Sequence, residues 1–222
     1  MRSLVQPLVL KSAAAGAAIT TVASCPRLIL WTARPHQLWL LTLTLAWASF
    51  FLWSFVFGWY PKYTGQPALI VKTTRRCRSA ATLAGLLGAV VLVRFIDPVL
   101  RPLIPDDYPG SAAAWLAATL FILAFEQLFF CLAPFAFFLR LSQRPGIATG
   151  LTVLFGAFLL YLKMLGWAGQ FSSFFILELF AWRLLTGFLS VTFFLKGGAL
   201  LNAWWIFLLQ IRHLVYLWTP AN

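Results

Sequence analysis

The sequence predicts an all-α, polytopic integral membrane protein with about six transmembrane helices. Of its 222 residues, 62% are hydrophobic and only 10% are charged. A soluble domain of this length could not bury so much apolar surface, whereas a bilayer solvates it. Backbone groups in lipid must pair within the protein, which allows only helices or closed barrels. Barrel strands alternate polar and apolar residues over short segments, but the apolar runs here are long and continuous, so helices are expected.

Six runs approach the roughly 20 apolar residues that cross the hydrocarbon. They cover residues 38–59, 80–100, a stretch within 112–139, 147–162, 171–195 and 199–218. Pro98 and Pro134 predict a kink or a helix end. Gly197 and Gly198 predict a turn between the last two helices.

Residues 1–35 are only weakly apolar, and we expect an interfacial or partly inserted segment there. Residues 36–222 then form a single transmembrane bundle. Basic residues are frequent both in 1–35 and in the 62–78 loop, and both segments favour the cytoplasm. A single span between them cannot satisfy both, unless the N-terminal segment itself enters the membrane. We expect a multi-pass protein of the bacterial cytoplasmic membrane.

The net charge of +12 comes mostly from residues between the apolar runs, as in the Lys72-Thr-Thr-Arg75-Arg76-Cys-Arg78 sequence. This placement predicts contact with anionic lipids, including bound lipids, rather than with nucleic acid. No cofactor is predicted.

Polar side chains inside predicted spans are costly in lipid, so they should face protein or water. Arg94 and Asp97 are three residues apart on one helix face and are expected to neutralise each other. Glu126 and Glu178 fit a functional site and a purely structural role equally well, and Glu126 is expected to meet a basic partner such as Arg183. The intramembrane polar candidates are Arg94, Asp97, Glu126, Gln127, Glu178 and Arg183.

Neither a metal site nor a catalytic set is predicted. Zinc requires several close Cys, His or carboxylate ligands, and the only histidines are His36 and His213, far apart in the chain. The three cysteines are widely separated and form no CxxC pair.

Four segments of the second half follow one another in a recognisable order. They are Phe125-Glu126-Gln127-Leu128-Phe129-Phe130-Cys131, Leu139-Arg140-Leu-Ser-Gln-Arg144, Leu154-Phe155-Gly156-Ala-Phe-Leu159 and Phe194-Leu195-Lys196-Gly197-Gly198-Ala199-Leu200. This order resembles the CPBP family, the intramembrane metalloproteases related to the CAAX prenyl endopeptidase. The resemblance covers about 112–218 and implies a CPBP-like helical core there.

The functional residues of that family are replaced at most of the matching positions. The family's motif has two glutamates followed by an arginine; here only Glu126 remains, with Gln127 and Cys131 in the other places. Leu159 stands for the first histidine, and Phe207 and Ile211 fall near the second histidine and the asparagine. The resemblance therefore implies a degenerate, non-catalytic relative whose former cavity has been filled by apolar side chains.

The sequence favours a non-catalytic accessory or scaffold subunit that packs against other integral membrane proteins. Small residues, such as Gly85, Gly88, Gly150 and Gly156, permit close helix packing. Two alternatives stay open: a CPBP-like protease with an atypical site, and a small transporter that uses Glu126 and Glu178. A transporter should present several polar residues on one face of two or more spans.

Overall fold

The computed structural model describes residues 4–32, 34–70, 72–166 and 171–218, and every regular element in them is a helix. Six helical stretches of this part are long and apolar enough to cross a membrane, which confirms an all-α, multi-pass membrane protein. The helices are α1 Pro7–Trp31, α2 Pro35–Thr64, α3 Arg75–Val91, α4 Asp97–Leu103, α5 Ala112–Phe121, α6 Ala133–Ser142, α7 Pro145–Leu165, α8 Ser173–Gln210 and α9 Arg212–Trp218.

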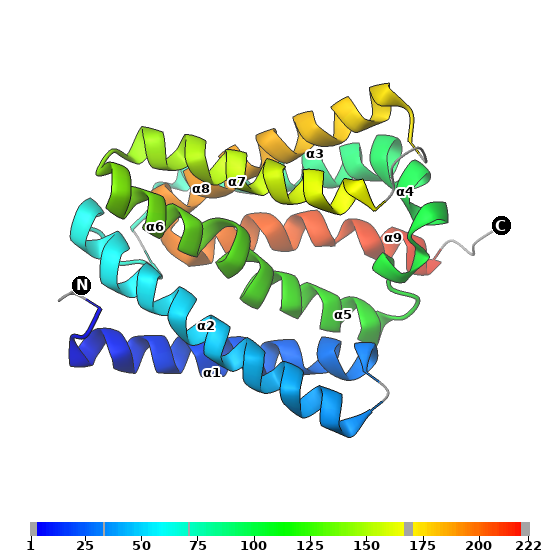
Figure 1. The fold of residues 1–222 in the computed structure, drawn as a ribbon. Helices are drawn as coiled ribbons and strands as arrows, with labels where there is room; N and C mark the ends of the chain where they lie inside the picture. Colours follow the sequence, from blue (N-terminus) through cyan, green and yellow to red (C-terminus); the bar gives the residue numbers. More distant parts are fainter. Residues whose placement is uncertain (1–3, 33, 71, 167–170, 219–222) are drawn as a thin grey trace.

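The first helix occupies most of the segment that was expected to be interfacial or partly inserted. α1 has 25 residues, is one of the candidate spans, and packs along α2 (Figure 1). Its alanines make the sequence only weakly apolar, but small residues let α2 approach closely: a Cβ on Gly16 would lie 2.9 Å from the Trp53 ring. The Trp53 indole donates a hydrogen bond to the Thr20 hydroxyl at 2.9 Å. α1 is therefore apolar enough to cross a membrane and also packs closely on α2.

Two predicted proline kinks take the form of π-helical turns. One π-helical segment, Leu92–Ile96, ends two residues before Pro98, and another, Leu128–Leu132, ends two residues before Pro134. Proline has no N–H to donate and its ring displaces the preceding turn, and a wider turn accommodates both effects. The chain thus stays helical from Arg75 to Leu103 and from Ala112 to Ser142. A third π-helical segment, Ile122–Glu126, has no such proline after it.

The last candidate span, Ser173–Leu217, consists of two helices that meet at Gly198. Gly198 has φ 73° and ψ −172°, which is not helical, and the chain reverses its direction there (Figure 1). This confirms the predicted turn at Gly197–Gly198. As a result, α1 begins at one end of the bundle and α9 ends at the other.

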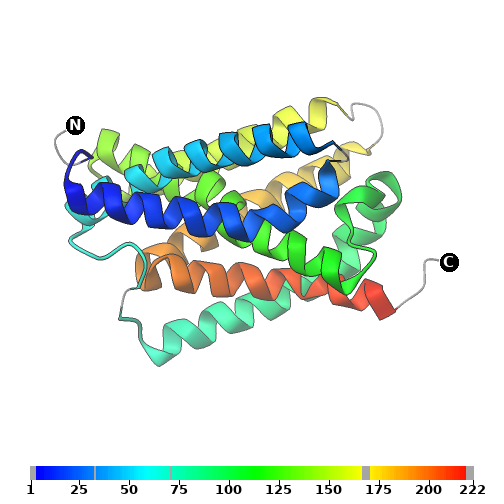
Figure 2. The same ribbon diagram turned by 90° about the horizontal axis from the view of Figure 1, so that it is seen from below.

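The helices are arranged around the run from α5 to α6. The α1–α2 pair packs on one side of this run, while α7 and α8 pack on the other, and α3 covers the outer face of α8 (Figure 2). Of the small residues noted in the sequence, Gly85 and Gly88 lie directly against Leu208 and Leu209, whereas Gly150 faces open space. The centre of the bundle lies where α5–α6, α7 and α8 meet.

Candidate functional site

A polar cavity of about 260 Å³ occupies the centre of the bundle. Its walls come from the α3–α4, α5–α6, α7 and α8 stretches. The polar residues among those that line it are Asp97, Glu126, Gln127, Thr152, Arg183, Thr186, Ser190, Gln210 and Arg212. A polar space of this size accommodates water or a small solute. The bundle is therefore not completely filled at this point, although most of the residues that line the cavity are apolar.

The cavity exists where the helices are locally wide. All three π-helical segments contribute side chains to its wall, including Leu92, Ile122 and Phe130. Irregular backbone at membrane depth is tolerated when it is buried in protein or lines a polar cavity. π-helical turns inside α-helices are also frequent at functional sites.

Glu126 and Arg183 line the same cavity, as the sequence suggested, but the bonds of Arg183 go elsewhere. The Arg183 Nε donates a hydrogen bond to the Gly156 carbonyl at 3.2 Å, and its guanidinium lies 5.0 Å from the centre of the Phe130 ring. Among the described residues no ion pair joins Glu126 to Arg183. The two side chains therefore face one cavity without an ion pair between them.

Gln127 forms part of a second polar contact beside the cavity. The Asn202 side chain is 1% exposed and donates a hydrogen bond to the Gln127 Oε1 at 3.2 Å. Next to it, the indole of Trp205 donates to the Ser190 hydroxyl at 3.1 Å. These bonds tie the α5–α6 stretch to α8 and connect the two halves of α8, which fixes the cavity wall.

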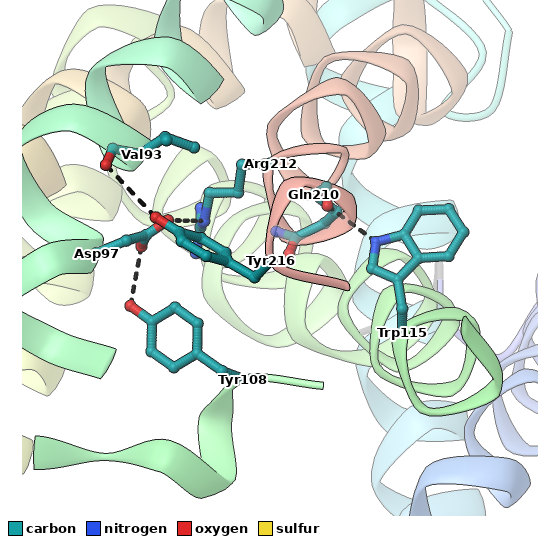
Figure 3. A network of polar contacts seen from close by, with 7 residues as sticks. All are labelled: Val93, Asp97, Tyr108, Trp115, Gln210, Arg212 and Tyr216. Atoms are coloured by element: carbon teal, nitrogen blue, oxygen red, sulfur yellow. Dashed lines mark hydrogen bonds and ion pairs between the residues drawn. The ribbon is translucent and has the colours of Figure 1, made fainter. Parts of the chain in front are cut away.

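A network of polar side chains closes the cavity toward the end where α9 lies (Figure 3). Asp97 is 1% exposed, forms an ion pair with Arg212 at 3.3 Å, and accepts a hydrogen bond from the Tyr108 hydroxyl at 2.9 Å. The Tyr216 hydroxyl donates to the Val93 carbonyl at 3.4 Å. The network holds the π-helical turn of residues 92–96 against α9.

The expected pair between Arg94 and Asp97 is not formed. Arg94 is exposed, and Asp97 is buried against Arg212. The spacing of three residues places two side chains on one face only in a regular α-helix. Because residues 92–96 form a wider turn, the two side chains point to different sides.

A second cavity, of about 330 Å³, continues from Glu126 toward the protein surface. It shares Glu126 and Arg212 with the central cavity and extends to Lys163 and Asp107. The Lys163 Nζ lies 3.0 Å from the Asp107 carboxylate, and both side chains are about half exposed, at 54% and 50%. Glu126 thus lies between the central cavity and a path that reaches the surface.

Tyr108 lies on the wall of the second cavity, in the loop between α4 and α5. Burial raises the pKa of the Tyr108 phenol, and the neighbouring Asp97 carboxylate raises this pKa further. The phenol therefore stays protonated and keeps its role as donor to Asp97.

The remaining predicted positions lie outside the central cavity. Glu178 is half-buried on α8 and lines neither of the two cavities. Of the positions matched to the CPBP family, Gln127 and Cys131 line the central cavity, whereas Leu159, Phe207 and Ile211 do not. Phe207 instead packs its ring near Trp115 and Trp204.

The sequence analysis missed several polar cavity residues, among them Thr152, Thr186, Ser190 and Gln210. A signal was present for two of them, because Arg183, Thr186 and Ser190 follow at spacings of three and four residues. This spacing places them on one face of a helix. A polar stripe on an otherwise apolar helix indicates a side that does not face lipid.

Within the described residues, His, Cys, Asp and Glu side chains do not gather in groups of three that could hold a metal ion. His213 packs edge-on against Tyr108, with ring centres 5.3 Å apart.

No protein-family model, curated protein or solved structure matches this chain.

Proposed function

We propose that this protein is a small membrane transporter that binds a polar solute in its central cavity. The carrying observation is the convergence of polar side chains from α5–α6, α7 and α8 on one cavity at the centre of the bundle. Ionisable residues at this depth mark substrate or ion pathways in membrane proteins.

The charges in the cavity favour a solute that carries both signs. Asp97 and Arg212 neutralise each other, which leaves Glu126 and Arg183 as opposite charges without a mutual ion pair. An ammonium group suits Glu126, and a carboxylate suits Arg183. Small zwitterions such as amino acids and betaines combine these groups.

The proposal is tested by thermal stability of the purified protein with glycine, alanine, proline and betaine, with acetate and ethylamine as single-charge references. A bound zwitterion should stabilise the fold by about 2.7 kcal/mol at a hundredfold excess over its Kd. Glu126→Gln and Arg183→Gln should abolish this stabilisation. Glu178→Gln is the matched control, since it removes a carboxylate outside both cavities.

Two results would contradict the transporter proposal. One is the absence of stabilisation by every zwitterion. The other is an equal loss of stabilisation in Glu178→Gln and Glu126→Gln. Where stabilisation is found, uptake of the radiolabelled solute into proteoliposomes tests transport itself.

As a second candidate, we propose an accessory subunit that packs against other integral membrane proteins through the first half of α2. Trp39 is 76% exposed and Trp47 is 57% exposed, and the Trp47 ring stacks on the Phe51 ring. Large aromatic side chains of this kind are enriched in protein interfaces.

Purification from native membranes in mild detergent tests this second candidate. Trp39→Ala with Trp47→Ala should release the partner proteins. Leu154→Ala with Phe158→Ala is the control, because it truncates two exposed apolar side chains on α7. Migration of the wild type as a lone monomer would argue against the subunit role.

In both roles we propose a non-catalytic protein of the bacterial cytoplasmic membrane, derived from a CPBP-like ancestor. Glutamine and cysteine at positions 127 and 131 support the non-catalytic role, because neither offers a strong base to activate water. We expect metal analysis to find less than one zinc per chain. One bound zinc together with cleavage of a membrane peptide would overturn this view.

A further inference from the structure

The two ends of the bundle differ sharply in charge. All five acidic residues of the chain lie between positions 97 and 178, away from the end at which α2, α6 and the first half of α8 finish (Figure 1). That end, called the basic end here, carries only positive charges: Lys62, Lys72, Arg75, Arg76, Arg78, Arg140, Arg144 and Lys196. It offers an anion several cations and no competing carboxylate.

At the basic end, the loop between α2 and α3 is fastened to the turn of α8. The Ala199 N–H donates to the Ala68 carbonyl at 2.9 Å, and the Leu200 N–H donates to the Leu69 carbonyl at 3.1 Å. The fit requires a glycine, because a Cβ on Gly198 would lie 2.6 Å from the Leu69 carbonyl oxygen. These bonds fix the loop beside Lys196.

A cavity of about 480 Å³ lies next to this fastened loop. Three separate segments supply its cations: Lys72 from the loop, Arg76 from the first turn of α3, and Lys196 from the α8 turn. All three side chains are exposed, and no acidic residue lines the cavity. Its other wall is apolar and includes Ala80 and Phe193.

The opposite face of α3 repeats this pattern of cations above apolar side chains. A groove there is lined by Arg75 and Arg78 near the helix start, and by Leu83, Leu86 and Trp204 further along. The Trp204 indole donates to the Thr82 hydroxyl at 2.9 Å, which orients the ring along α3. Cations at the helix end with apolar walls below them match an amphiphile, whose charged group lies at the membrane surface.

We propose that the cavity formed by Lys72, Arg76 and Lys196 binds the phosphate headgroup of an anionic phospholipid. The three cations neutralise the phosphate, and the wall formed by Ala80 and Phe193 receives the upper part of an acyl chain. Basic pockets between transmembrane helices bind lipid phosphates in this way. A free phosphate would use the cations but gain nothing from the apolar wall.

The test uses the full-length protein in a neutral detergent, with thermal stability measured against added dioleoylphosphatidylglycerol, dioleoylphosphatidylcholine or inorganic phosphate. The anionic lipid should raise the Tm, and the other two should not. The variant Lys72→Gln/Arg76→Gln/Lys196→Gln should weaken the apparent lipid affinity by at least about tenfold, given the loss of three cations near the surface. The variant Lys72→Arg/Lys196→Arg keeps the charges and should keep the effect.

The control variant Lys11→Gln/Lys62→Gln/Arg144→Gln removes three charges from the same end of the bundle but none from the cavity. It should bind the lipid as the wild type does. An equal loss of affinity in this control would show that overall charge attracts the lipid, and would overturn the proposed site. An equal Tm increase with inorganic phosphate would overturn the choice of a lipid.

Discussion

At the scale of single residues, Asp97 has the most constrained environment among the charged side chains. It is buried inside a membrane-spanning stretch and is held by Arg212 and Tyr108. Removal of one partner of a buried ion pair strongly destabilises the folded protein, because the other charge stays buried without a counter-charge. Removal of both partners leaves no unpaired charge behind. The pair therefore serves to lock α9 and the π-helical turn together.

We expect Asp97→Ala to destabilise the protein by about 3 kcal/mol, because the partly buried Arg212 guanidinium is left unpaired. Arg212→Ala should cost a similar amount, and the double variant should cost clearly less than the sum of the two. Unfolding in mixed micelles measures all three free energies. Arg94→Ala, an exposed position in the same stretch, should change stability by less than about 0.5 kcal/mol. Additive effects of Asp97→Ala and Arg212→Ala would rule out the coupling.

At the scale of elements, irregular backbone determines where the cavity and the chain reversal lie. The π-helical turns before Pro98 and Pro134 widen two helices, and both contribute side chains to the wall of the central cavity. The positive φ of Gly198 turns α8 back and brings the α2–α3 loop against it. Each feature is local, yet each positions residues that are far apart in the sequence.

Gly198→Ala should destabilise the protein by about 2 kcal/mol or more. A positive φ with ψ near 180° is essentially restricted to glycine and costs an L-residue about 1–3 kcal/mol, and the new Cβ would also collide with the Leu69 carbonyl. Gly150→Ala is the control, since this helical glycine faces open space, and alanine there should be neutral or stabilising by up to about 1 kcal/mol. Equal unfolding free energies for the two variants would contradict the fastened turn.

At the scale of the whole molecule, α1 resolves the conflict over orientation that the sequence left open. Because α1 and α2 form a hairpin, the start of α1 and the 62–78 loop lie at the same end of the bundle. Lys11 then joins the other cations of the basic end. The positive-inside rule predicts that this end faces the cytoplasm and that the end of α9 lies on the opposite side.

Cysteine labelling in intact cells tests this orientation, in a background with Cys25, Cys77 and Cys131 replaced by alanine. Gln66→Cys and Gly146→Cys, at the basic end, should be protected from a membrane-impermeant maleimide. Gly110→Cys and Ser173→Cys, at the other end, should be labelled. Labelling of Gln66→Cys and Gly110→Cys from the same side would contradict the arrangement, because the α3–α4 stretch lies between them.

The sequence by itself determined the membrane environment, the helical class and most span positions. In lipid, long runs of apolar residues are stable as helices. Prolines and glycines interrupt or end these helices whatever the surrounding fold. Glu126, Gln127 and Arg183 were recognisable as cavity candidates for the same reason, since polar groups at such depth must avoid lipid.

Only the tertiary structure decided how these groups are combined. The spacing of Arg94 and Asp97 predicted an ion pair between them. In the structure, a π-helical turn directs the two side chains to different sides, and Asp97 pairs with Arg212, which lies more than a hundred residues later in the chain. Residues 1–35 predicted only an interfacial or partly inserted segment, whereas α1 packs along α2, with Gly16 and Thr20 against Trp53. The cavity likewise depends on helix widths and crossings. Such contacts between distant residues depend on three-dimensional packing, which local hydrophobicity and spacing do not encode.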